Sequence, residues 1–154
     1  MGVVSYFSYI VKNHANIIRK LSSNTIHIDN LYLDCNSIIY DVVHNIDFTK
    51  IVENETVGIL NAVCAKIDSY IAELKPSNIV YIAFDGVAPV AKLEQQRARR
   101  YKSVYQTMIT RSIRKSVEPD PWNTTAITPG THFMATLNEK IEAHYKDPEK
   151  FGVS

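Results

Sequence analysis

Hydrophobic positions along this chain follow a helical period in some segments and form short apolar runs in others, which together predict the element order α-β-α-α-β-α-α. Apolar residues recur every three or four positions over residues 5–21, and this spacing predicts a first helix. Two apolar runs, residues 26–33 and 79–84, predict buried strands. A helix is expected over residues 37–45, and a longer amphipathic one follows it.

The longer helix starts at Asn54 or Thr56, since either side chain is a good N-cap. Asn61, Lys66 and Asp68 are expected on its solvated face. Its apolar positions fall on the other side, which is predicted to face the core: Ile59, Leu60, Val63, Cys64, Ile67, Tyr70, Ile71 and Leu74. With a strand on each side, these helices predict a parallel crossover of right-handed sense.

The last part of the chain predicts one more helix after a proline-rich break. Thr128 is the expected N-cap and Pro129 the first helical residue, with the helix running to about residue 145. Trp122, just before it, is expected to pack over the edge of the core, and a base-stacking platform is the alternative. The predicted buried positions of this helix are Phe133, Leu137 and Ile141.

A carboxylate and a basic helix stand side by side after the second predicted strand. The strand leads to Asp85, a Gly-Val-Ala-Pro turn follows, and a helix rich in lysine and arginine begins. On a helix of about 100° per residue, one narrow arc collects Lys92, Gln96, Arg99, Arg100 and Ser103. Carboxylates bind hard cations, and clustered guanidinium groups bind phosphate, so the pair predicts chemistry on a phosphodiester. The alternative is the solvated basic face of an ordinary surface helix.

A second carboxylate occupies the equivalent place in the first half of the chain. Asp34 ends the first predicted strand, as Asp85 ends the second, and the carboxyl ends of parallel strands meet at one edge of a sheet. The two acids therefore predict a shared metal site. Each could instead be a helix cap or turn residue, which is the commoner role of a single aspartate after a strand.

Composition fits one globular domain with a local basic block. The 154 residues are 45% hydrophobic and carry a net charge of only +1, yet about half of the 17 lysines and arginines lie between residues 92 and 115.

Cys35 and Cys64 lie in apolar settings without a CxxC spacing, which predicts reduced thiols and an intracellular protein, cytoplasmic or nuclear. No membrane span or targeting signal is expected. The Asn-, Ile- and Lys-rich composition is typical of AT-rich genomes, such as those of large DNA viruses and protists.

Four ordered segments carry a family resemblance: Met1-Gly2-Val3 with Phe7, residues 29–38, residues 85–100, and Asn123 with residues 126–131 and Phe133-Met134. In this order and spacing they resemble the N-terminal part of the XRN-type 5′→3′ exoribonucleases, relatives of the flap-endonuclease-like nucleases. The resemblance covers nearly the whole chain. It implies an α/β fold of the PIN-like nuclease type, a parallel sheet flanked by helices, of which this chain would hold the first half.

The resemblance also implies roles for particular residues. Asp34 and Asp85 match catalytic, metal-binding carboxylates of the family, with Mg²⁺ or Mn²⁺ as the cofactor. Tyr40 stands where the family commonly has a histidine that stacks on the terminal base, and a tyrosine ring can also stack on a base. The residues that match the family's 5′-phosphate pocket are Lys92, Gln96, Arg99 and Arg100.

In the family, further metal-binding acids lie in a Gly-Glu-Gly-Glu stretch and in later aspartates, and this sequence contains none of these motifs. Residues 1–154 are therefore expected to be the N-terminal, incomplete portion of the exonuclease domain. The implied parent hydrolyses 5′-monophosphorylated RNA to nucleoside monophosphates, and the chain alone is expected to be inactive. Its implied partners are this RNA and the remainder of the nuclease domain, with no membrane. A DNA flap nuclease and a noncatalytic RNA-end-binding module remain alternatives. A nucleotide-binding Rossmann-like domain is disfavoured because no glycine-rich loop follows either strand.

Overall fold

The computed structural model describes residues 5–17, 27–51, 54–114 and 122–147, and the predicted element order is confirmed there. The helices and strands are α1 (Tyr6–Asn13), β1 (Asn30–Asp34), α2 (Asn36–Asn45), α3 (Glu55–Leu74), β2 (Ile79–Ala83), α4 (Val90–Arg114) and α5 (His132–His144). Short 3₁₀ turns lie at Ala15–Ile17, Phe48–Lys50 and Thr124–Ala126. No helix among the described residues is both long enough and apolar enough to cross a membrane.

The sheet consists of β1 and β2, which pair in parallel from Asn30 opposite Ile79 to Asp34 opposite Ala83. The predicted β-α-β arrangement is therefore confirmed, but both strands are shorter than expected. β1 begins at Asn30 rather than at residue 26, because its partner starts only at Ile79. The turn before β2 instead bonds to the residues before β1, where the Ser77 N–H donates to the Ile28 carbonyl at 3.0 Å.

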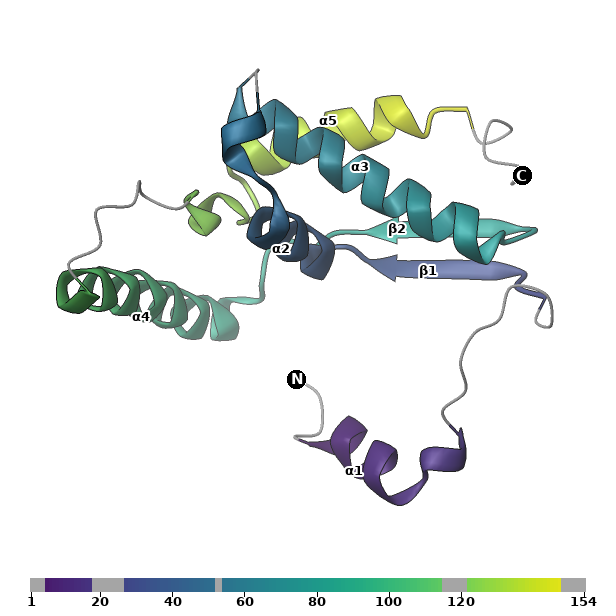
Figure 1. Cartoon of the computed structure of the whole chain (residues 1–154), viewed down its shortest axis with the longest axis horizontal. Helices are drawn as coiled ribbons and strands as arrows, with labels where there is room; N and C mark the ends of the chain where they lie inside the picture. Colours follow the sequence, from purple (N-terminus) through teal and green to yellow (C-terminus); the bar gives the residue numbers. More distant parts are fainter. Residues whose placement is uncertain (1–4, 18–26, 52–53, 115–121, 148–154) are drawn as a thin grey trace.

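The core lies between the sheet and the helices α2, α3 and α5. Figure 1 shows α3 and α5 on one side of the strands, and α2 beyond the ends of the strands. The predicted interior of α3 is largely confirmed, although Tyr70 and Leu74 are only half-buried. Asn54 caps α3, as its Oδ1 accepts from the Thr56 N–H at 2.8 Å. The side chains buried in this core include Ile39, Ile59, Val63, Ile67, Phe133, Leu137 and Ile141.

The contact between α5 and α3 overturns one sequence expectation. Asp68 was expected on a solvated face, yet its Oδ1 accepts from the Tyr145 hydroxyl at 2.7 Å, and its Oδ2 lies 2.9 Å from His144 Nε2. Burial, together with this hydrogen bond to Asp68, raises the pKa of Tyr145. A polar contact between residues 77 positions apart therefore fastens the end of α5 to the middle of α3.

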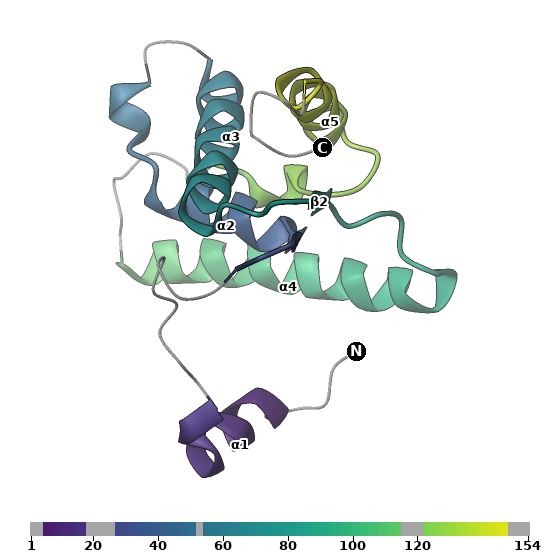
Figure 2. The ribbon, with the colours of Figure 1, turned by 90° about the vertical axis from the view of Figure 1, so that its right-hand side faces the viewer.

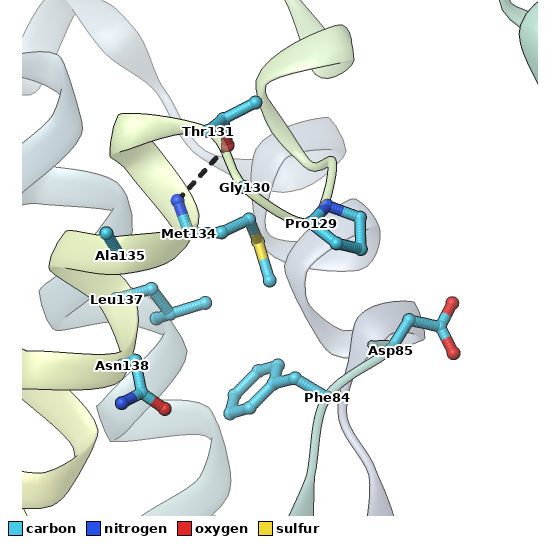
Figure 3. Close-up of a pocket in the computed structure, with 9 residues that line it drawn as sticks. All are labelled: Phe84, Asp85, Pro129, Gly130, Thr131, Met134, Ala135, Leu137 and Asn138. Atoms are coloured by element: carbon cyan, nitrogen blue, oxygen red, sulfur yellow. Dashed lines mark hydrogen bonds between the residues drawn. The ribbon is translucent and has the colours of Figure 1, made fainter. Parts of the chain in front are cut away.

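The start of α5 also differs from the prediction. The helix begins at His132 with Thr131 as N-cap, whose Oγ accepts from the Met134 N–H at 3.3 Å (Figure 3). Gly130 has φ of 87°, a left-handed conformation that cannot continue an α-helix from Pro129. Thr128 instead donates its hydroxyl to the Thr125 carbonyl at 2.6 Å, inside the preceding turn.

Two helices stand outside the packed layer. α1 ends at Asn13, so the helix expected over residues 5–21 is shorter than predicted, and residues 18–21 lie outside the described part. α4 buries none of its 25 residues. Figures 1 and 2 both draw α4 below the strands and α3 above them, so the basic helix lies away from the layer that holds the core.

Candidate functional site

The two predicted carboxylates lie at the same edge of the sheet. Asp34 is the last residue of β1, and Asp85 follows the end of β2 at Ala83 by two residues. Because Asp34 is opposite Ala83 in the parallel register, both acids emerge where the strands end, as the sequence predicted. Both residues are exposed to solvent. Two accessible carboxylates with oxygen donors suit a hard divalent cation.

Asn36 connects the two strand ends, a role that the sequence did not reveal. Its Oδ1 accepts a hydrogen bond from the Asp85 backbone N–H at 2.8 Å. The neighbouring Cys35 N–H donates to the Ala83 carbonyl at 2.8 Å and extends the strand pairing by one step. Asn36 therefore fixes the turn that carries Asp85 relative to the loop that carries Asp34. An asparagine at the start of a helix gives no sign of a partner 49 residues away.

Cys35 follows Asp34 directly but is no candidate ligand or nucleophile. The residue is completely buried, and this burial raises the pKa of its thiol to about 11. The thiolate is the form that binds metals and attacks electrophiles, so Cys35 stays inert near neutral pH. Burial also raises the pKa of Cys64, and both thiols are free, which confirms the prediction of reduced core cysteines.

A pocket of about 560 Å³ joins Asp85 to the basic helix. The turn from Gly86 to Pro89 forms one wall, and α4 contributes Lys92, Gln96 and Arg99. Three of the four residues predicted to hold a phosphate thus surround one cavity together with a candidate metal ligand. Their spacing of three and four positions places them on one side of α4.

Arg100, the fourth predicted phosphate residue, lines the neighbouring groove rather than this pocket. Tyr40, the predicted stacking residue, lies in that groove with Arg100, and Arg99 borders both spaces. Trp122 is half-buried and packs edge-on against Phe133, with ring centroids 5.0 Å apart. Its predicted position over the edge of the core is confirmed, although it also lines the groove.

Part of the charge of the basic helix has no counter-ion among the described residues. Within the part of the chain that the structure describes, no acidic side chain forms an ion pair with Lys92, Arg99 or Arg100. Fixed cations without a protein counter-ion attract a diffusing anion. The pocket therefore combines uncompensated positive charge with one carboxylate at its rim.

Figure 3 shows how Asp85 is oriented relative to the core. Its carboxylate points away from Phe84, Met134 and Leu137, although Asp85 lines with them a second space, of about 330 Å³, beside the start of α5. The acid is thus directed to solvent rather than into the apolar interior. Over the described ranges, no three acidic, histidine or cysteine side chains gather closely enough to hold a metal ion.

A parallel α/β sheet with acids at its strand ends and a basic helix beyond them defines a partial domain of the PIN-like nuclease type. Residues 1–151 match the family model described as the XRN 5′-3′ exonuclease N-terminus. The chain belongs to this family, as its ordered motifs predicted.

Curated relatives agree with the family assignment. The chain is 36% identical over 157 residues to 5′-3′ exoribonuclease 1 of Saccharomyces cerevisiae, a match covering 96% of this chain and 10% of the relative. It is 31% identical over 150 residues to 5′-3′ exoribonuclease 1 of Homo sapiens, covering 92% of this chain and 9% of that protein. The match to 5′-3′ exoribonuclease 2 of Schizosaccharomyces pombe is 34% over 134 residues, covering 77% and 13%. The chain thus spans only about a tenth of the length of these proteins.

Proposed function

We propose that this chain forms the N-terminal portion of a 5′→3′ exoribonuclease domain that removes nucleoside monophosphates from 5′-monophosphorylated RNA. The observation that carries the proposal is the pocket in which Asp85 faces the same cavity as Lys92, Gln96 and Arg99. A phosphate-binding surface beside a metal-binding carboxylate suits an enzyme that holds an RNA end while it cuts the next phosphodiester. Membership of a family of 5′-3′ exonucleases supports the same assignment.

The terminal phosphate would occupy the basic pocket. It carries more charge and more free oxygens than an internal phosphodiester, so fixed cationic donors favour it. The flat guanidinium of Arg99 can bond two phosphate oxygens at once, while the Lys92 ammonium acts as a point charge. A hydroxyl end would leave the donors unpaired.

Cleavage would occur at the first internal phosphodiester. Water adds to its phosphorus, the bond to the 3′ oxygen of the first nucleotide breaks, and that oxygen leaves as a hydroxyl after taking up a proton. The products are a nucleoside 5′-monophosphate and an RNA with a new 5′-monophosphate. Because the new end carries the group that the pocket recognises, each cut prepares the next.

Asp34 and Asp85 would bind the divalent cation, Mg²⁺ or Mn²⁺, through their carboxylate oxygens. Such an ion, when bound, stabilises negative charge that develops on the phosphoryl group. Two carboxylates cannot complete a two-metal centre, so we propose that other parts of the parent protein supply the remaining ligands. The 154-residue chain alone is accordingly expected to release no mononucleotides.

The test compares variants of the parent enzyme on RNAs with a 5′-monophosphate or a 5′-hydroxyl. Arg99→Ala should lower kcat/KM on the monophosphate substrate by about 10- to 100-fold, the scale of a lost hydrogen bond to a charged group, and change the hydroxyl substrate little. Arg97→Ala is the matched control, because Arg97 lies on α4 but lines neither the pocket nor the groove. Equal effects of both variants on both substrates would refute the phosphate pocket.

A second measurement tests the carboxylates. Asp34→Ala and Asp85→Ala should each lower turnover by about a thousandfold or more while sparing RNA binding, because transition-state charge loses its stabilisation. Near-normal turnover in either variant would make that aspartate a turn residue. Turnover that is equal on matched RNA and DNA ends would favour a flap-type nuclease over the proposed exoribonuclease.

A further inference from the structure

Four exposed apolar side chains stand four positions apart along α4: Tyr101, Tyr105, Ile109 and Ile113. Their exposed fractions lie between 41% and 76%. None of the four lines the pocket beside Asp85 or the neighbouring groove. Because residues four positions apart are neighbours on a helix surface, these side chains form one continuous surface, which we call the apolar row.

The residues that the structure describes leave the apolar row largely uncovered. None of the 25 residues of α4 is buried. Figures 1 and 2 show this helix apart from the helices that hold the core. Helices of globular proteins gain most of their stability by packing an apolar face, and a contiguous exposed apolar surface marks an interaction site. The apolar row therefore has the character of a docking surface.

The shape of the apolar row favours a second helix as its occupant. Each step of four positions turns by about 40°, so the row winds by about 120° around α4 over about 18 Å. Such an inclined row is a ridge that packs into the groove between two rows of another helix, which then crosses at about 50°. A flat lipid surface would contact only part of a row that winds in this way.

Basic side chains border the apolar row. Arg97 continues it by one step toward the N-terminus, and Lys102 and Arg114 belong to the neighbouring row. All three are exposed, and none forms an ion pair with an acidic side chain among the described residues. The only acid of α4 is Glu94. A second copy of this chain would place like charges against one another, whereas a helix with acids beside its apolar face would neutralise them.

We propose that the apolar row docks an amphipathic helix of a partner protein, with glutamates or aspartates beside its apolar residues. Tyr101 and Tyr105 can donate their hydroxyl protons to such carboxylates while their rings pack against aliphatic side chains. Tyrosine and arginine are among the side chains that most often anchor protein interfaces. The surface lies outside the pocket and the groove, so the inference does not depend on the proposed function.

The probe is a designed helical peptide of about 20 residues, with leucines along one face and glutamates on both sides of them. A second peptide carries lysines in place of the glutamates. The anisotropy of each fluorescently labelled peptide, titrated with the 154-residue chain at physiological ionic strength, measures its affinity. The glutamate peptide should bind saturably and about tenfold more tightly than the lysine peptide.

Tyr105→Ala and Ile109→Ala truncate the middle of the apolar row at exposed positions, where alanine favours the helix. Each should weaken binding of the glutamate peptide by about tenfold, the scale of a truncated interface anchor. Val90→Ala is the matched control, because Val90 is 83% exposed on the same helix but lies outside the row. This control should leave the affinity within about twofold.

Lys102→Glu tests the charge pattern beside the row. It should weaken binding of the glutamate peptide and strengthen binding of the lysine peptide, each by about fivefold. Lys92→Glu makes the same change in the pocket, about 14 Å of helix before the row begins. Since this separation exceeds the screening length at physiological salt, both affinities should stay within about twofold.

The inference is overturned if the glutamate peptide shows no saturable binding. Equal effects of Lys92→Glu and Lys102→Glu, with no effect of Tyr105→Ala, would mean that the peptide binds the pocket through charge alone. A dimer in sedimentation velocity that Tyr105→Ala abolishes would make a second copy of the chain the occupant. Binding to phosphatidylserine vesicles that Tyr105→Ala abolishes, without binding of either peptide, would make the occupant a lipid surface.

Discussion

Replacing Asn36 by alanine should loosen the connection between the two strand ends. The substitution removes the acceptor of a 2.8 Å hydrogen bond from the Asp85 N–H. A net loss of about 1 kcal/mol in the free energy of unfolding is expected, because this bond is at the exposed surface and water can hydrate the freed N–H. For a chain of this size, that loss lowers Tm by about 2–4 °C.

The larger consequence should appear in metal binding. In the proposed function Asn36 would position the turn that carries Asp85, and removing such a supporting group typically costs about tenfold or more in metal affinity. Titration of the chain with Mn²⁺, followed by paramagnetic broadening of the Asp85 amide signal, measures this affinity. The amide of Asp85 should also exchange faster with solvent in the variant.

Asn45→Ala is the matched control for this experiment. Asn45 lies on the same helix and donates through Nδ2 to the Asp41 carbonyl at 2.8 Å, a bond contained within α2. It should lower Tm to a similar extent but leave Mn²⁺ binding unchanged. Equal Mn²⁺ affinity in the two variants would refute the positioning role of Asn36.

Three further predictions concern the core. Leu137→Ala should lower the free energy of unfolding by about 2–5 kcal/mol in urea titrations, since Leu137 is completely buried, whereas exposed Asn138→Ala should cost far less. Stability should fall as the pH rises from about 9 to 11, because the folded state holds the Cys35 proton that the unfolded chain releases, and Cys35→Ala should flatten this slope. Tyr145→Phe should cost about 1 kcal/mol through the lost bond to Asp68, and an unchanged midpoint would contradict that role.

Much of the fold and part of the candidate site follow from local sequence patterns. The helical period of α3 and α5 identified Ile67, Leu137 and their buried neighbours, because a helix that packs on one side repeats its apolar residues every three to four positions. A strand–helix–strand crossover favours parallel pairing, which the structure confirms, so Asp34 and Asp85 emerge at one edge. The periodicity of α4 also placed Lys92, Gln96 and Arg99 together.

The remaining features depend on contacts between distant parts of the chain. Asn36 bonds to Asp85 and Tyr145 bonds to Asp68 only because packing brings together residues that are 49 and 77 positions apart. No local period encodes such pairs. The positive φ of Gly130 sets the start of α5, which the capping pattern alone placed three residues too early. The groove at Trp122 likewise exists only where α4 passes the η3 turn (Thr124–Ala126). The sequence determines which side chains are available there, and the tertiary structure brings them together to line one groove.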